Sequence, residues 1–315
     1  MKVVFLDKVH PVLAEELTAN GYECIDATAV SNDELPDVIT DAVGIVVRSR
    51  LKISSSFLAS AKNLKFVARS GAGIENIDEE YCRLHNILIF NAPEGNRTAV
   101  AEHALGMLLA LFNHLSKGNE EVRRGIWDRE GNRGIEISGK TVGIIGCGNN
   151  GGKFAQLLTG FDCQILAYDK YKSNFGTERI QEATMQEIFE KADIVSFHIP
   201  QTEETIQLAN SSFFQHFKKP IYVINLSRGT IVNLSDLWEA IEQKKVLGAC
   251  LDVLETENKA FENDFKNQEL SSALQQLLNS EKVLFSPHVG GWTHESYYKL
   301  SKVLAEKILS HFSMK

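Results

Sequence analysis

The chain has 315 residues, of which 43% are hydrophobic and 23% are charged, as in an ordinary globular protein. This length predicts about two domains. The formal net charge of −8 argues against a protein that binds nucleic acid through a broad basic face.

The first hundred residues contain short apolar runs separated by helical patterns, the first of which covers about Pro11–Asn20. The runs are predicted strands: Val3–Leu6, Glu23–Asp26, Gly44–Val47, Lys65–Ala68 and Ile87–Phe90. Strands that alternate with helices predict a parallel sheet built from βαβ units.

A second alternation follows a long helix that is expected over Val100 to about Val122, with the boundary between the two halves near residues 95–140. Its predicted strands are Thr141–Ile145, Gln164–Tyr168, Ile194–His198, Ile221–Leu226, Ala249–Val253 and Val283–Phe285. A helix is expected at Lys153–Leu158. The polar stretch Glu255–Lys282 is expected to be a loop with one helix near Leu270–Leu278.

The sequence does not favour a membrane protein or a metal-binding protein. The longest apolar run near the middle, Ala104–Phe112, is far shorter than the ~20 residues of a spanning helix. The run Val3–Leu6 stops at Asp7, too early for a signal peptide. Five cysteines without a CxxC motif indicate thiols in a reducing cytoplasm. No His, Asp or Glu cluster has metal-ligand spacing, so no metal is expected.

Residues 146–151 have the spacing GxGxxG between a predicted strand and a predicted helix. In this context the spacing indicates a dinucleotide site, where the helix N-terminus receives the pyrophosphate. Asp169 ends the next strand and can accept hydrogen bonds from both ribose hydroxyls. Its charge favours NAD over NADP, although Lys170 and Lys172 weaken this preference. The expected contacts in the turn are Gly146, Gly148, Asn149, Asn150 and Gly151.

Three segments rich in reactive groups follow later strands: Asn225–Gly229, Leu251–Glu257 and Ser286–Gly291. The carboxyl ends of parallel strands are where open α/β sheets bind ligands. An Arg, a Glu and a His at three such ends can meet over one nicotinamide.

The order GxGxxG, Asp, NxSRG, DVxxxE, PHxGG resembles the D-isomer-specific 2-hydroxyacid dehydrogenase family, over about residues 45–300. The resemblance implies an α/β fold with two doubly wound parallel-sheet domains. A Rossmann NAD-binding domain (99–291) is inserted in a flavodoxin-like substrate domain (1–98 and 292–315). It also implies a homodimer, with the dimerisation region at about 99–138.

In this resemblance His288 is the general acid–base, since imidazole titrates near neutral pH. Glu257 orients His288, although Glu255 is a neighbouring candidate. The spacing from Arg228 favours Glu257. Arg228 would clamp the substrate carboxylate with its planar fork of donors. The family has Pro after this Glu where Asn258 stands here, and the stretch from Glu to His is longer than usual.

Other residues complete the expected site. The remaining implied cofactor contacts are His198, Pro200, Asn225, Ser227, Asp252 (at the nicotinamide amide) and Gly290. The loop Ser70, Gly71, Ala72 and Gly73 is expected to receive the substrate carboxylate through its backbone. His103, on the long helix, is expected to pack rather than to act.

The segment Arg48, Ser49 and Arg50 resembles the one by which D-3-phosphoglycerate dehydrogenases hold the substrate phosphate. Alternate side chains on a strand share a face, so both guanidinium groups can reach one dianion. The alternative is that Arg48 and Arg50 are ordinary surface charges.

The expected function is therefore that of an NAD-dependent D-3-phosphoglycerate dehydrogenase of serine biosynthesis, in a short form without a regulatory domain. It converts 3-phosphoglycerate to 3-phosphohydroxypyruvate. Alternatives are a glyoxylate or hydroxypyruvate reductase, a D-lactate dehydrogenase, or an NAD-sensing regulator without turnover. The set Arg228, Glu257 and His288 argues against the regulator.

Overall fold

The computed structural model describes residues 1–257 and 269–313. It divides into two compact units. The first contains Met1–Arg97 and the chain from Trp292 onward, and the second contains Thr98–Glu257 and the chain up to Gly291. Asn258, where the family pattern has Pro, lies outside the described residues.

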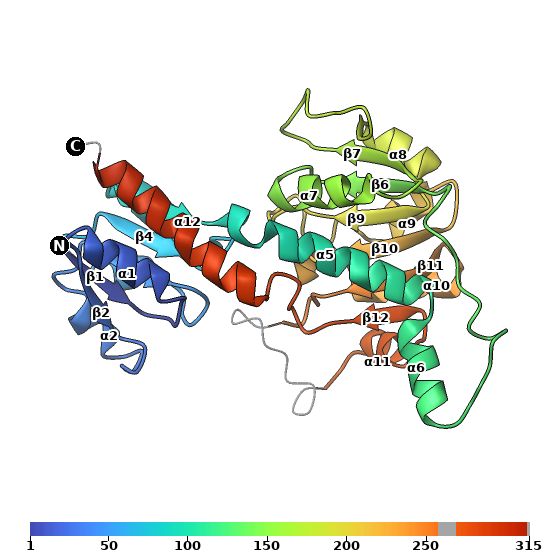
Figure 1. The fold of residues 1–315 in the computed structure, drawn as a ribbon, viewed down its shortest axis with the longest axis horizontal. Helices are drawn as coiled ribbons and strands as arrows, with labels where there is room; N and C mark the ends of the chain where they lie inside the picture. Colours follow the sequence, from blue (N-terminus) through green and yellow to red (C-terminus); the bar gives the residue numbers. More distant parts are fainter. Residues whose placement is uncertain (258–268, 314–315) are drawn as a thin grey trace. The chain divides into compact units, whose positions relative to one another are not determined.

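The first unit is built on a five-stranded parallel sheet of order β2-β1-β3-β4-β5. Its strands are β1 (Lys2–Phe5), β2 (Glu23–Asp26), β3 (Gly44–Val47), β4 (Phe66–Arg69) and β5 (Leu88–Asn91). One face packs on α1 (Val12–Ala19) and α12 (His294–Ser313). The other packs on α2 (Leu35–Val38), α3 (Ser55–Leu58) and α4 (Glu79–Leu84). Figure 1 shows α12, the last helix of the chain, beside the strands of this unit.

The second unit has a seven-stranded parallel sheet of order β12-β11-β10-β9-β6-β7-β8. Its strands are β6 (Thr141–Ile145), β7 (Gln164–Tyr168), β8 (Gln181–Glu182), β9 (Ile194–Phe197), β10 (Ile221–Asn225), β11 (Val246–Leu251) and β12 (Val283–Phe285).

Helices cover both faces of this second sheet. One face packs on α5 (Pro93–Phe112) and α7 (Asn149–Leu158). The other packs on α8 (Met185–Lys191), α9 (Ser211–His216), α10 (Leu234–Glu242) and α11 (Ser272–Leu278). A 3-10 turn (Gly229–Ile231) lies between β10 and α10. The predicted α/β class, with doubly wound parallel sheets, is confirmed.

The strands were predictable because they are buried on both faces. All residues of β3, β4, β6 and β9 are buried. Such strands are near-continuous apolar runs rather than alternating ones. The two sheets have the flavodoxin-like and the Rossmann strand orders, in which ligands bind where the strand order reverses.

The expectation of one helix over residues 100–122 is wrong. Helix α5 begins earlier, at Pro93, and ends at Phe112, and α6 covers Leu115–Arg123. His114 between them has a φ of 50°, in the left-handed region that interrupts a helix. Helix α7 also begins before the predicted residue 153, directly after the glycine turn.

Among the described helices, none is long and apolar enough to cross a membrane. All five cysteines are free thiols. Cys82 and Cys250 are buried, and burial raises the pKa of both, that of Cys82 to about 11.

Candidate active site

The turn between β6 and α7 has no room for side chains at two of its glycines. Gly146 has a φ of 93°, and a Cβ there would lie 2.5 Å from the carbonyl oxygen of His198. A Cβ on Gly151 would lie 1.9 Å from the carbonyl oxygen of Gly146. Both positions therefore require glycine, one for the turn and the other for close packing of the helix on the strand.

The same turn leaves donors open toward a ligand. Gly148 caps α7 without a side-chain hydrogen bond, and a Cβ on it would meet nothing within 4 Å. Within the described chain, the N–H groups of Asn149, Asn150 and Gly151 have no acceptor. The Oδ1 atom of Asn150 is buried and also has no partner there. Open amides at the positive end of a helix fit the pyrophosphate of a dinucleotide.

Asp169 joins this turn to the loop after β7. One carboxylate oxygen accepts the N–H of Cys147 at 2.9 Å. The other accepts the N–H groups of Tyr171 and Lys172 at 2.9 and 3.1 Å. A carboxylate has about four acceptor positions. The chain itself uses three of these positions, and the contact of Asp169 with the ribose hydroxyls stays a prediction.

His198 lies on the wall of the turn through its backbone. Its ring nitrogen Nε2 is 2.8 Å from the Ser196 hydroxyl, and its ring contacts Phe154. Burial lowers the pKa of His198 to about 4. Its imidazole is therefore neutral at physiological pH and adds no charge to the site. Pro200, two residues on, is exposed.

The candidate catalytic residues His288 and Glu257 form a paired imidazole and carboxylate. Nδ1 of His288 lies 2.6 Å from Oε2 of Glu257, and both side chains are mostly buried. The other oxygen of Glu257 accepts the N–H of Leu254. Because the pair uses Nδ1, Nε2 is the atom that can exchange a proton with a substrate. His288 itself has a φ of 53°, and its N–H donates to the Asp252 carbonyl at 2.8 Å.

Glu255, the neighbouring candidate, lies elsewhere. Its carboxylate accepts a hydrogen bond from the backbone of Leu234, and burial raises its pKa. The acid beside His288 is therefore Glu257.

Arg228 follows β10 in a turn that the preceding residues hold. The side chain of Asn225 is fully buried. Its amide nitrogen donates to the Arg228 carbonyl at 2.9 Å. Its amide oxygen accepts the N–H and the hydroxyl of Ser227. A Cβ on Gly229 would lie 2.0 Å from the carbonyl group of Leu254. This close approach brings the Arg228 turn against the loop that leads to Glu257.

Asp252 holds the loop that carries His288. Its carboxylate is 2% exposed. It accepts the N–H groups of Val289 and Gly290 at 2.9 and 2.8 Å and the Ser286 hydroxyl at 2.6 Å. Three of about four acceptor positions thus serve the chain itself, and the expected contact with the nicotinamide amide stays a prediction.

His103 was expected to pack, but its Nε2 lies 2.9 Å from the Ser286 hydroxyl. No motif surrounds His103, and Ser286 is 183 positions away in the sequence. The sequence therefore held no signal for this contact.

In the first unit, Asp7 organises the Arg48–Arg50 loop. One oxygen of Asp7 accepts the N–H groups of Arg48, Ser49 and Arg50 at 2.6, 3.0 and 3.1 Å. Strand β3 ends at Val47, so the premise that Arg48 and Arg50 share a strand face is wrong. No motif in the sequence indicated this role for Asp7.

The two arginines have different surroundings. The guanidinium of Arg50 donates to the carbonyls of Leu6, Ala27 and Thr28 at 3.0–3.3 Å and to that of Val30.

The guanidinium of Arg48 instead stacks on the Trp292 ring, 3.7 Å from its centre. Burial lowers the pKa of Arg48. A planar guanidinium stacked on an aromatic ring keeps its edge donors available for an anion.

The loop after β4 presents backbone donors. Within the described residues, the N–H groups of Ala72 and Gly73 have no acceptor. The Ala72 carbonyl accepts the Asn91 side chain at 2.6 Å, and a Cβ on Gly71 would clash with the Arg69 guanidinium. Ser70 is buried. The Asn91 side chain thus holds the loop, and the N–H groups of Ala72 and Gly73 stay available to a ligand.

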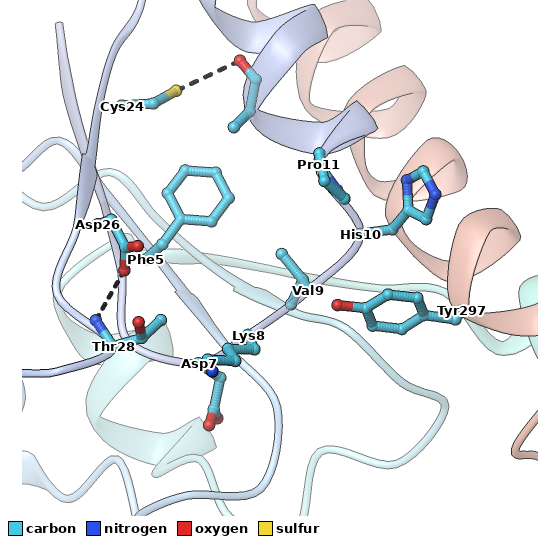
Figure 2. A pocket seen from close by; sticks show the side chains of 11 residues that line it. Phe5, Asp7, Lys8, Val9, His10, Pro11, Cys24, Asp26, Thr28 and Tyr297 are labelled. Carbon is cyan, nitrogen blue, oxygen red and sulfur yellow. Dashed lines mark hydrogen bonds between the residues drawn. The ribbon is translucent and has the colours of Figure 1, made fainter. Parts of the chain in front are cut away.

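A separate pocket of about 340 Å³ lies in the first unit at the ends of β1 and β2. Figure 2 shows Asp7, Lys8, His10, Asp26 and Tyr297 around it. Two residues that line the pocket, Asp7 and Thr28, also contact the Arg48–Arg50 loop, so the pocket adjoins the expected substrate loop without containing it.

Known proteins show similarity over the whole chain. Residues 105–290 match the family model described as D-isomer specific 2-hydroxyacid dehydrogenase, NAD binding domain. A D-3-phosphoglycerate dehydrogenase of Archaeoglobus fulgidus is 32% identical over 98% of this chain, which spans 57% of that relative's length. A hydroxypyruvate reductase of Thermotoga maritima is 30% identical over 96% of this chain and 95% of its own.

The fold is also found in solved structures. A D-lactate dehydrogenase of Aquifex aeolicus, complexed with NAD and lactic acid, superposes with a TM-score of 0.82 at 23% identity, covering 99% of this chain and 96% of that one. The family model matches more than half of this chain. The same chain contains the strand orders, the glycine turn and the His–Glu pair described above. The chain belongs to the D-isomer specific 2-hydroxyacid dehydrogenase family, and residues 105–290 form its NAD-binding domain.

Proposed function

We propose that this chain catalyses the reversible, NAD-dependent oxidation of a D-2-hydroxy acid to the 2-keto acid. The observation that carries the proposal is the 2.6 Å contact between His288 and Glu257, in the same unit as the glycine turn. An acid that holds one ring nitrogen fixes the tautomer and orientation of the imidazole, which suits proton transfer at the other nitrogen.

Bound NAD supplies the hydride acceptor. Nε2 of His288 takes the hydroxyl proton during oxidation and returns it during reduction. Glu257 fixes the orientation of the ring through Nδ1. Arg228 binds the substrate carboxylate. In the first unit, the open amides of Ala72 and Gly73 are donors that can receive an anionic group.

We propose 3-phosphoglycerate and 3-phosphohydroxypyruvate as the substrate pair. Arg48 supports this, because its stacked guanidinium can receive a phosphate dianion. The Archaeoglobus relative, named D-3-phosphoglycerate dehydrogenase, is consistent with it. Arg50 lends no support, because its donors already serve main-chain carbonyls.

A second candidate is hydroxypyruvate reduction. With Arg50 engaged, a single arginine of the segment is left for a substrate phosphate. The Thermotoga relative, a hydroxypyruvate reductase, matches this chain over nearly its whole length.

The test follows NADH absorbance while the protein reduces 3-phosphohydroxypyruvate, hydroxypyruvate, glyoxylate and pyruvate separately. A kcat/KM at least tenfold higher for the phosphorylated acid supports the first candidate. A preference for hydroxypyruvate replaces it with the second. Tight NADH binding without turnover of any acid would contradict the enzymatic proposal.

We also propose a homodimer in the cytoplasm. Val122, Ile126 and Trp127, on α6 and the loop after it, are 53, 49 and 79% exposed. Such neighbouring apolar side chains suit a second copy of the chain. Sedimentation should give a dimer at micromolar concentration, and a monomer alone would contradict this.

A further inference from the structure

Three polar side chains form a continuous chain of contacts behind the loop of His288. Nε2 of His103 lies 2.9 Å from the Ser286 hydroxyl, which lies 2.6 Å from Oδ1 of Asp252. Asp252 in turn accepts the N–H groups of Val289 and Gly290, the two residues after His288. All of these residues belong to the second unit.

The direction of the hydrogen bonds follows from the chemistry of each group. An ionised carboxylate only accepts, so the Ser286 hydroxyl donates its single proton to Asp252. The serine oxygen can then only accept from His103, which must carry a proton on Nε2. The second ring nitrogen, Nδ1, is left as the position where His103 can bind another proton.

That second proton would place a positive charge close to Asp252. Nε2 of His103 is 3.7 Å from Oδ1 of Asp252, and the carboxylate is 2% exposed. Few waters can screen a pair in such surroundings. The imidazole itself is 30% exposed, so protons from solvent can reach it.

We propose that His103 is a titratable positioning residue for the catalytic histidine, acting through Ser286 and Asp252. The kinetic part of this proposal rests on the proposed function. A protonated His103 would place its charge against the buried Asp252 carboxylate, which holds the two residues after His288. A neutral His103 keeps the hydrogen bonds but leaves the negative charge of Asp252 uncompensated.

The other groups around His103 do not replace this coupling. Glu102 precedes it on α5 and is exposed. Met107, on the same helix, offers its sulfur to the Ser286 hydroxyl at 3.4 Å, a weak alternative acceptor. Glu257 is engaged with His288. Asp252 is thus the buried charge that His103 meets.

The test compares two substitutions. In His103→Gln the amide can still donate to Ser286 but cannot titrate, and in His103→Leu both properties are lost. His216→Gln is the matched control, because His216 is an exposed histidine of α9 in the same unit. Keto-acid reduction is measured from pH 5 to 9. The backbone amide resonances of Val289 and Gly290 are followed by NMR over the same range, without substrate.

We expect His103→Gln to keep its plateau kcat/KM within about twofold and to change the shape of the pH profile, because the group that can carry a charge beside Asp252 is removed. His103→Leu should lose about fivefold at the plateau, as for one lost hydrogen bond. The pH-dependent shift of the two amides that is due to His103 should vanish in both variants and persist in His216→Gln.

An unchanged rate profile together with unchanged amide titration in His103→Gln would overturn the proposal. The NMR readout requires no turnover, so the two proposals fail separately. If the wild type reduces no keto acid while the amides still respond to His103, the proposed function fails and the coupling stands. If turnover is present but the amides do not respond to His103, the coupling fails alone.

Discussion

Replacing Arg50 by lysine is expected to weaken the first unit rather than the binding of substrate. The Arg50 guanidinium reaches the carbonyls of Leu6, Ala27 and Thr28 at 3.0–3.3 Å. Lysine has one ammonium point charge in place of this planar fork and cannot span these acceptors. A lost hydrogen bond to a charged donor costs ~1.5–3 kcal/mol. With one or two bonds lost and partial access of water, we expect a loss of about 2–4 kcal/mol in the free energy of unfolding.

Calorimetry measures this directly. A loss of that size lowers Tm by about 5–10 °C in a protein of this size class. Steady-state rates with 3-phosphohydroxypyruvate and hydroxypyruvate are measured below the transition, where the variant is folded. The KM values of the two acids should change by the same factor.

Arg48→Lys is the matched control, because Arg48 belongs to the same loop but contacts Trp292 instead of carbonyls. It should change Tm by less than about 2 °C. It should raise the KM for 3-phosphohydroxypyruvate about tenfold more than the KM for hydroxypyruvate, because one charge-assisted bidentate contact with the phosphate is lost. If Arg50→Lys leaves Tm unchanged and selectively raises KM for the phosphorylated acid, the structural role of Arg50 is refuted.

Three further predictions concern the cofactor unit. The wild type should have a higher kcat/KM with NADH than with NADPH. Asp169→Ala should reduce the ratio of the two kcat/KM values about tenfold, because the charge that repels a 2′-phosphate is removed. Equal wild-type rates with both cofactors would contradict this. Burial lowers the pKa of His198 to about 4, below the usual imidazole value of ~6.5. The unfolded chain therefore binds the proton more readily than the folded one. The free energy of unfolding should fall by about 3 kcal/mol as the pH drops from 6.5 toward 4. His198→Asn should flatten this part of the curve of urea midpoint against pH, and an equal slope in both proteins would show that other groups cause it. Burial raises the pKa of the Cys147 thiol in the glycine turn, so alkylation at pH 8 should be slow, and NADH should slow it further; a rate unaffected by NADH would argue against cofactor binding at this turn.

Much of the fold could be predicted because buried parallel strands are apolar along their whole length. Strand β6 and the glycines at 146 and 151 are specified locally, by burial and by the space at the turn. The break between α5 and α6 was not predictable, because it depends on a left-handed His114 in an otherwise helical pattern.

Contacts within the candidate site were predictable where the residues lie in contiguous motifs. Glu257 could be chosen over Glu255 by spacing, and the structure places its carboxylate against His288. Contacts between distant segments had no such signal. Asp7 meets the Arg48–Arg50 loop from more than 40 positions away, and only the parallel pairing of β1 with β3 brings the two together.

The measurement that tests the account most directly is keto-acid-dependent consumption of NADH by the wild type and by His288→Gln, with NADH affinity measured separately by fluorescence. Loss of the acid–base group should lower kcat by about 10²–10⁴-fold while the Kd for NADH stays within about twofold. Glu257→Gln should give a smaller loss, because it orients His288 through Nδ1 without exchanging the substrate proton. A His288→Gln variant that turns over the keto acid at the wild-type rate would contradict the proposed mechanism.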